Sequence, residues 1–385
     1  KILIPILKFM KISYQWLKDY CNHNLSVQEL SEGLTNVGLV VDTTTPIGDD
    51  YCLDVEVTSN RPDCLGIMGI AREVAVIVHG EFVVPAVEYI ATDENIEEAT
   101  SVTIEEKDLC SRYTARIIRG ATIAPSPEWL QQRLQVIGLR PVNNVVDITN
   151  YVLMECGQPL HAFDLDALEG KRIVVRCASN GETLEAIDGS KCTFTSDLLV
   201  IADSKKPVAV AGIMGGKGTE VTESTKDIFL ESAFFEPRNV RKSSRKLGIT
   251  SDSSFRFERH VDPECVDWAS RRAAKMIQEI AGGRILEGAI DSNFIKQKKK
   301  SVSLRISKLN NLLGIHLEKG EIKEILERLS FTIISETEDS LEVSVPSFRG
   351  DVYREIDLIE EVARIHGYNN IPAIGNIGVK LNQEN

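Results

Sequence analysis

The chain has 385 residues, enough for roughly two to four domains that each bury a core. Its 43% hydrophobic and 26% charged residues are typical of a soluble globular protein. The formal net charge of −13 argues against a nucleic-acid surface spread over the whole sequence, because phosphate binding requires clustered Lys and Arg. We therefore expect any RNA contact to be local and expect no DNA partner. No apolar run approaches the roughly 20 residues of a membrane-spanning helix, so we expect no membrane partner.

The eight cysteines form no CxxC pair and have no histidine at zinc-finger spacing. We expect them to be small core residues in a reducing compartment, the cytoplasm, without disulfides or structural zinc. The apolar opening, residues 1–9, is too short to cross a membrane and has no cleavage site after it. It is expected to be an upstream extension before Met10, not a signal peptide.

The first predicted domain, residues 1–92, begins with two short helices. Ser26 and Glu29 have the spacing of a capping box, which marks the start of the second helix. A strand is predicted around residues 53–57, followed by a helix that ends at Gly80.

Composition shifts mark the remaining boundaries. Residues 43–50 are expected to be a simple link inside the first domain, and residues 92–101 form an acidic linker. The predicted order is a second domain at 93–293, a basic linker at 296–300, a third domain at 301–373 and a tail at 374–385.

The densest polar pattern lies in residues 140–166, between breaks rich in Gly and Pro. Apolar residues at three- and four-residue steps predict a helix over residues 142–155. Gln158, His161 and Asp164 are then expected on a tight turn. The amides and His161 would either cap turns as structural groups or build a polar pocket.

Strands are predicted over residues 172–203, followed at 207–222 by a strand and a glycine-rich loop. The loop lacks the spacing of phosphate-binding motifs, so its glycines are expected to let backbone groups approach a ligand or a packed strand. Glu231 stands in the middle of a strand-like run, residues 228–235, among aromatic side chains. Such a carboxylate must either pair with a nearby arginine or point into a pocket and accept a hydrogen bond from a ligand.

Residues 237–248 predict a helix with one basic side, and residues 263–281 predict an amphipathic helix. The basic side is either an ordinary solvated face or a surface that steers an RNA end toward the pocket. Four acidic residues surround the start of a last helix, predicted over residues 356–365: Asp351, Asp357, Glu360 and Glu361. They would either favour the positive end of the helix dipole or, converging without basic partners, hold a hard cation such as Mg²⁺.

Several long motifs occur in order along the chain: NRPDCL, RPVNNVVDITNYV with QPLHAFD, AGIMGG, RFER with VDP, and SFRGD with DLIEEVARIHGY. Over residues 10–372 the chain resembles the β subunit of bacterial phenylalanyl-tRNA synthetase. The resemblance implies a multidomain α+β fold, with a mixed sheet in a B3/B4-like editing module between a small B1-like domain and a small B5-like domain. The OB-fold usually inserted in the first domain is absent near residues 43–50.

The resemblance also implies an editing pocket that hydrolyses mischarged Tyr-tRNA(Phe). Its residues would be Arg140, Asn150, His161, Ala211, Gly212, Gly215, Glu231 and Ser251. Glu231 would bind the tyrosine hydroxyl and reject phenylalanine, which leaves that buried acceptor unpaired. The glycines would admit the ring, while Asn150 and His161 position the ester and a water molecule. Ser251 replaces the usual Thr, and His260 stands where Gly is usual, which predicts a changed backbone.

As partners, the resemblance implies an α subunit in an α2β2 heterotetramer and tRNA(Phe). The α subunit would carry the ATP and phenylalanine site, so ATP is used by the holoenzyme and not by a motif in this chain. Mg²⁺, shared with the α subunit, would be held by Asp351, Asp357, Glu360 and Glu361. Two alternatives are a non-catalytic scaffold that docks the α subunit and positions tRNA, and a free-standing deacylase.

Overall fold

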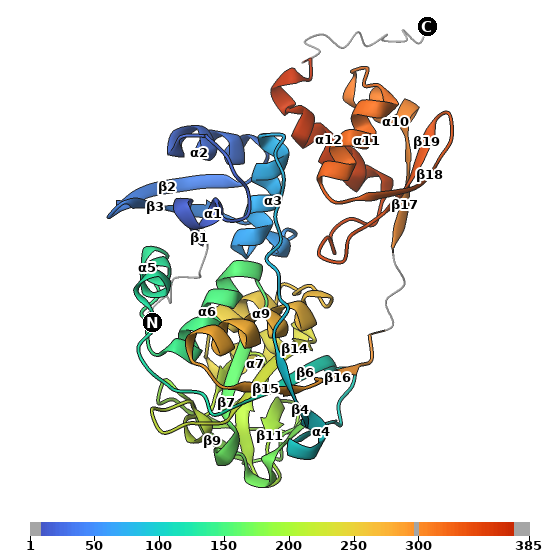
Figure 1. The fold of residues 1–385 in the computed structure, drawn as a ribbon. Helices are drawn as coiled ribbons and strands as arrows, with labels where there is room; N and C mark the ends of the chain where they lie inside the picture. Colours follow the sequence, from blue (N-terminus) through green and yellow to red (C-terminus); the bar gives the residue numbers. More distant parts are fainter. Residues whose placement is uncertain (1–8, 296–299, 373–385) are drawn as a thin grey trace, which may run out of the picture.

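The computed structural model describes residues 9–295 and 300–372 (Figure 1). The described residues form a multidomain α+β structure with mixed sheets, which confirms the predicted fold class. Residues 1–8, most of the predicted basic linker and the predicted tail lie outside the described residues. No helix in the described ranges has the length and apolar character needed to cross a membrane.

The first part of the chain is a three-stranded antiparallel sheet covered by helices. Its elements are β1 (Phe9–Ser13), α1 (Tyr14–Leu17), α2 (Val27–Asn36), β2 (Val40–Ile47), β3 (Asp50–Glu56) and α3 (Ile67–Ile77), with strand order β1-β3-β2. The Ser26–Glu29 capping box is present at the start of α2. Residues 43–50, expected to link the two halves of the first domain, do so as a hairpin: β2 and β3 pair through this segment as far as Ile47 and Asp50, and Gly48 turns the chain with a φ of 59°.

The middle of the chain contains two larger sheets. Its elements are β4 (Ala91–Asn95), α4 (Ile96–Ala99), β5 (Ser101–Ile104), β6 (Cys110–Arg119), α5 (Glu128–Val136), α6 (Asn144–Cys156), β7 (Leu160–Asp164), β8 (Arg172–Cys177), β9 (Thr183–Glu185), β10 (Lys191–Thr193), β11 (Leu199–Ala202), β12 (Pro207–Val210), β13 (Met214–Gly215), β14 (Ile228–Phe235), α7 (Pro237–Leu247), α8 (Asp252–Phe257), α9 (Cys265–Ile280), β15 (Arg284–Glu287) and β16 (Ile290–Asn293). One sheet has the order β4-β15-β6-β14-β7, with β16 also on β6, and the other has the order β13-β12-β11-β8-β5.

Side chains of β14 point alternately into two separate hydrophobic clusters of the central core. Ile228 and Leu230 pack in the cluster that contains α6 and α9, whereas Phe229 and Ala233 pack in the cluster that contains the five-stranded sheet. Because strand side chains alternate between faces, Glu231 shares the face of Phe229 and Ala233. It therefore lies between the two sheets.

The predicted helix over residues 142–155 is present as α6. The Asn143 side chain caps its start by accepting from two backbone N–H groups, and Gly157, with a φ of 81°, ends it. The tight turn predicted after it is wrong, because residues 160–164 form β7, which pairs along β14. This pairing makes His161 a residue of the sheet.

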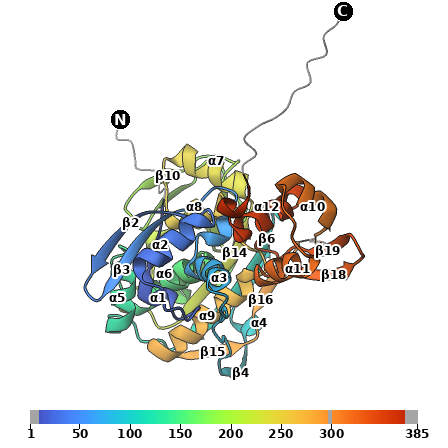
Figure 2. The ribbon, with the colours of Figure 1, turned by 90° about the horizontal axis from the view of Figure 1, so that it is seen from above.

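The last part is a small α+β unit with strand order β17-β19-β18. It contains β17 (Ser301–Arg305), α10 (Ile306–Leu313), α11 (Lys319–Arg328), β18 (Thr332–Glu336), β19 (Ser340–Ser344) and α12 (Glu355–His366). The unit lies to one side of the first part, with α12 toward α3 (Figures 1 and 2). Arg364 of α12 reaches Glu73 of α3 at 2.6 Å.

Candidate functional site

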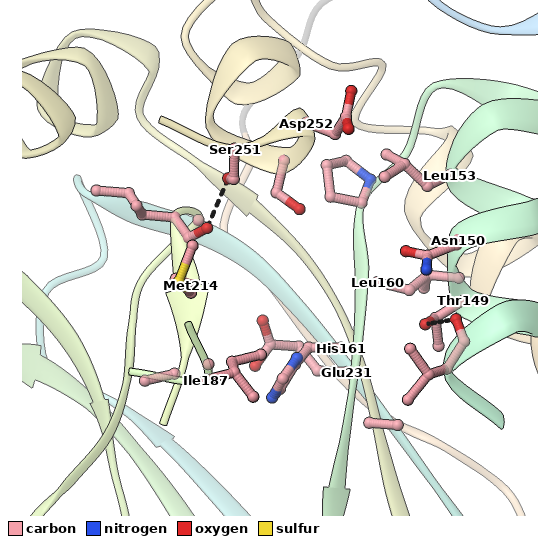
Figure 3. Close-up of a pocket in the computed structure, with 18 of the residues that line it drawn as sticks. Thr149, Asn150, Leu153, Leu160, His161, Ile187, Met214, Glu231, Ser251 and Asp252 are labelled. Atoms are coloured by element: carbon pink, nitrogen blue, oxygen red, sulfur yellow. Dashed lines mark hydrogen bonds between the residues drawn. The ribbon is translucent and has the colours of Figure 1, made fainter. Parts of the chain in front are cut away.

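A cavity of about 430 Å³ lies between the two central sheets, beside α6 and α8. Its walls are mainly apolar and include Val146, Leu153, Ile187, Ile213, Met214, Val221 and Phe257. Of the predicted pocket residues, it brings together Asn150, His161, Gly212, Gly215, Glu231 and Ser251. Asn150 comes from α6, His161 from β7, Glu231 from β14 and Ser251 from the start of α8 (Figure 3). Gly212 lies in the turn between β12 and β13, and Gly215 ends β13.

Glu231 is the buried carboxyl group of this cavity, with 6% of its surface exposed. Its Oε2 accepts a hydrogen bond of 2.6 Å from the Tyr113 hydroxyl, and its Oε1 has no hydrogen-bond partner among the residues described. The arginine pairing considered from the sequence is wrong, since no ion pair within the described ranges involves Glu231. Burial raises the pKa of Glu231 to about 7, against a smaller lowering by the Tyr113 hydrogen bond.

His161 lies directly across from Glu231 in the β7–β14 pair (Figure 3). Side chains at such paired positions share a face and lie about 5 Å apart at Cβ. Burial lowers the pKa of His161 to about 4, so the imidazole is neutral near pH 7. Its Nε2 is buried and has no hydrogen-bond partner among the described residues, which leaves a polar atom that a ligand or water can satisfy.

The glycines act differently from the expectation that they admit a ligand ring. A Cβ on Gly215 would lie 2.3 Å from Cε1 and 2.6 Å from Nε2 of His161, so this glycine makes room for the imidazole. Gly212 has a φ of 69°, and a Cβ there would meet Phe235, Phe257 and Val240 at 3.0 to 3.1 Å. Both glycines shape the cavity wall by close packing.

The remaining predicted residues fall into different positions. Asn150 is half-buried on α6 and lines the cavity. Ser251 also lines the cavity. Its hydroxyl donates to the Ile213 carbonyl at 2.7 Å and caps α8, so the hydroxyl already has backbone hydrogen-bond partners (Figure 3). Ala211 is buried beside the cavity without lining it, and Arg140 is exposed outside it, two residues before the lining residue Val142.

Sequence reasoning missed Tyr113, Thr149, Ile187 and Met214. Tyr113 comes from β6, far from Glu231 in sequence, and only the β6–β14 pairing brings the two together. The alternation of residues 113, 115 and 117 on one strand face was the available signal, but it does not identify the facing strand. The other three are ordinary lining residues without a distinctive motif.

Comparisons with known proteins find similarity over most of the chain. The B3/4 domain family matches residues 109–282, and the tRNA synthetase B5 domain family matches residues 302–368. The phenylalanine–tRNA ligase beta subunit of Rhodopirellula baltica is 47% identical over 363 residues, covering 94% of this chain and 53% of that protein. The beta subunit of Moorella thermoacetica is 46% identical over 336 residues, covering 87% of this chain and 42% of that protein.

This chain belongs to the phenylalanine–tRNA ligase beta-subunit family. It spans about half the length of the curated relatives that it matches. An N-terminal fragment of the phenylalanyl-tRNA synthetase beta subunit from Pyrococcus horikoshii shares the fold, with a TM-score of 0.53 at 17% identity. That match covers 93% of this chain and 99% of the fragment.

In this chain, the four residues predicted to bind magnesium surround a second, separate cavity of about 270 Å³ at the start of α12. The premise that they lack basic partners is wrong. Arg349 binds Asp351 at 2.9 Å and Glu361 at 2.6 Å, Arg354 binds Asp357 at 2.9 Å, and Arg364 also binds Glu361 at 2.6 Å. Glu360 is exposed.

Among the described residues, three metal-ligand atoms lie within 4.8 Å of one another only at Asp63, Cys64 and Glu73. That group is itself bound by Arg61 and Arg364. Three of the four carboxylates, Asp351, Asp357 and Glu361, are bound to guanidinium groups, and with Glu360 they form no cluster of three metal-ligand atoms, so they do not fit a magnesium ion.

His260, where the resemblance predicted a changed backbone, has a φ of 80°, in the left-handed region that glycine adopts more readily than other residues. The imidazole packs edge-on against Phe234, with ring centroids 5.1 Å apart. A non-glycine residue in this conformation stores strain that the surrounding contacts must offset.

Proposed function

We propose that this chain contributes the editing site of a phenylalanine–tRNA ligase beta subunit and hydrolyses the ester of mischarged Tyr-tRNA(Phe). The observation that carries the proposal is that Glu231 lines a largely apolar cavity and that its Oε1 has no hydrogen-bond partner among the described residues. An aromatic ring fits the apolar walls, and a phenolic hydroxyl can satisfy that acceptor. A phenylalanyl group would bury the same acceptor without a partner, which is penalised by about 1–3 kcal/mol.

The residues suggest how the ester would be handled. With a pKa near 7, the Glu231 carboxyl can accept from or donate to a phenolic hydroxyl around neutral pH. The neutral His161 imidazole and the Asn150 amide are polar groups of the same cavity that can orient a water molecule toward the ester carbonyl. Attack by that water forms the new C–O bond, and the ribose oxygen leaves with a proton. We assign no general base to the chain, and a ribose hydroxyl at the tRNA 3′ end is proposed to assist.

The proposed partners are an α subunit, in an α2β2 assembly, and tRNA(Phe). ATP and magnesium would serve the synthetic reaction of that assembly. Because the Asp351, Asp357 and Glu361 carboxylates are bound by arginines here, we derive no step through magnesium from this chain.

A scaffold without hydrolytic activity is the second candidate. It is favoured by Ser251, whose hydroxyl is taken up by backbone bonds, and by the buried ion pairs that join α3 to α12. A free-standing deacylase leaves the last α+β unit without a role.

The test is hydrolysis of Tyr-tRNA(Phe) and Phe-tRNA(Phe) by the chain with the α subunit present. Selective loss of the tyrosyl ester is expected, and Glu231→Ala should reduce the selectivity about 10- to 100-fold. Glu185→Ala, which changes an exposed glutamate of β9, is the matched control. Selectivity that survives Glu231→Ala would rule out the role given to Glu231. No hydrolysis by the assembled wild type would favour the scaffold.

A further inference from the structure

Tyr113 and Glu231 form an isolated polar pair between the two central sheets. Tyr113 is fully buried, and its hydroxyl donates to Glu231 Oε2 at 2.6 Å. In the β6–β14 pair, Glu231 lies opposite Ala115 and Tyr113 lies opposite Ala233. The two side chains are therefore diagonal neighbours on one face of the sheet, within reach for a long aromatic side chain.

Among the described residues, Glu231 has no hydrogen-bond or ion-pair partner other than Tyr113. Its cross-strand neighbour His161 forms no hydrogen bond with it, and no Lys or Arg within the described ranges pairs with it. Cys110 is buried nearby and contributes no charge of opposite sign. The orientation of the carboxyl group thus depends on one hydrogen bond, which occupies Oε2 and leaves Oε1 to the cavity.

We propose that Tyr113 is a positioning residue that holds the Glu231 carboxyl group so that Oε1 alone is presented to a phenolic hydroxyl in the cavity. This inference deepens the proposed function and rests on it for the identity of the natural ligand, a tyrosyl group. The positioning itself concerns any small phenol that enters the cavity.

Loss of this hydrogen bond has two physical consequences. The carboxyl group becomes free to turn, so either oxygen can face the cavity or neither can. The pKa of Glu231 rises further, because the Tyr113 hydroxyl lowers it by favouring the ionised form. A purely structural tyrosine would produce neither effect at the cavity.

The experiment compares binding of p-cresol and toluene to the full chain by isothermal titration calorimetry. These probes differ by one hydroxyl group. The wild type is expected to bind p-cresol at least about 10-fold more tightly, a difference of about one hydrogen bond. Tyr113→Phe should lose most of that preference while keeping its toluene affinity. Tyr151→Phe is the matched control, since Tyr151 is also buried and its hydroxyl accepts from Arg133 away from the cavity.

A second measurement needs no variant and guards against a Tyr113→Phe chain that fails to fold. In the wild type, the Tyr113 hydroxyl proton resonance should shift on addition of p-cresol and remain unchanged with toluene. Equal binding of the two probes by the wild type, an unchanged preference in Tyr113→Phe, or an unmoved Tyr113 resonance would each overturn the inference.

The result is separable from the fate of the proposed function. A p-cresol preference that Tyr113→Phe abolishes, in a chain that hydrolyses no tyrosyl ester with its α subunit, would support the positioning role and reject editing. Selective ester hydrolysis that Tyr113→Phe leaves intact would support editing and reject the positioning role.

Discussion

Two glutamates, Glu231 between the central sheets and Glu73 on α3, are both deeply buried, with 6% and 2% of their surfaces exposed. Burial raises the pKa of each, but only Glu231 keeps a raised pKa, about 7. At Glu73 the guanidinium groups of Arg364 and Arg61 outweigh burial and lower the pKa. Burial alone therefore does not set the protonation state of a carboxyl group; its partners decide it.

The difference separates a structural ion-pair network from a candidate binding site. The Glu73 region is a closed ion-pair network: Arg364 binds both Glu73 and Glu361, and Arg61 binds Asp63 and Glu73. The Glu231 region has an open acceptor and an open imidazole nitrogen beside a cavity. A buried polar group with its partners present is satisfied within the fold and costly to unpair, whereas a buried group without one is available to a ligand.

The largest expected effect comes from removing an arginine from the buried ion-pair network around Glu73. Arg364→Met leaves Glu73 and Glu361 without a shared cation and should destabilise the chain by about 3–5 kcal/mol. Denaturant-induced unfolding measures it. Arg328→Met, which breaks a surface pair with Glu324 at 3.0 Å, should change stability by less than about 1 kcal/mol. Equal effects of the two variants would contradict the distinction between buried and surface pairs.

The next effect is pH-dependent and belongs to Glu231. Its pKa rises from 4.5 to about 7 on folding, so its stabilising contribution is fully present below about pH 4.5 and is lost as pH rises to about 7. The loss amounts to about 3 kcal/mol. Thermal unfolding of wild type and Glu231→Gln across this range should show the variant gaining relative stability with rising pH.

Glu185→Gln, on the exposed surface of β9, is the control for the substitution itself. The Glu73 network predicts the opposite sign: a lowered pKa gives stability that is present above the unfolded value and lost in acid. A Glu231→Gln difference that falls with pH would contradict the assigned protonation.

A smaller effect is expected at the cavity wall. Gly215→Ala forces a Cβ against the His161 ring and should destabilise the chain by about 1–3 kcal/mol and displace the imidazole. Thermal unfolding and the His161 ring resonances measure both effects. Gly218→Ala is the control, because a Cβ there meets nothing within 4 Å. An unmoved His161 resonance in Gly215→Ala would contradict the packing role of the glycine.

The smallest effect concerns His260, which borders cavities beside both Phe234 and Arg349. His260→Gly relieves the left-handed strain, whereas His260→Ala removes the same ring and keeps the strain. The glycine variant should therefore be more stable than the alanine variant by about 1 kcal/mol in denaturant unfolding. Equal stabilities would show that the backbone relaxes at this position.

Local sequence signals predicted much of the fold. The Ser26 capping box, the helix at α6 and the strand around Glu231 were readable because each depends on spacing within one segment. The strand at β7 was missed, since its residues extend only when paired with β14. The hairpin at residues 43–50 was missed because its turn-forming residues also suit a linker.

The site was harder to predict than the fold. The residue pattern singled out His161 and Glu231 as possible pocket residues, family resemblance gave them roles, and the structure places them on adjacent strands. Tyr113 and the arginine partners of the α12 carboxylates depend on contacts between segments distant in sequence or on side-chain direction, which spacing does not encode. The same limit explains why Gly215 was assigned to a ligand ring and not to an imidazole.

The short β2–β3 hairpin bears on how this architecture tolerates change in length. Its turn at Gly48 projects from the edge of a sheet whose strands are paired on both sides of the turn. Extra sequence placed there leaves the strand register intact, and the entropy of loop closure grows only with the logarithm of the added length, by about 0.6 kcal/mol per doubling. The hairpin turn is thus a point at which a long insertion would cost little stability while the surrounding core folds in the same way.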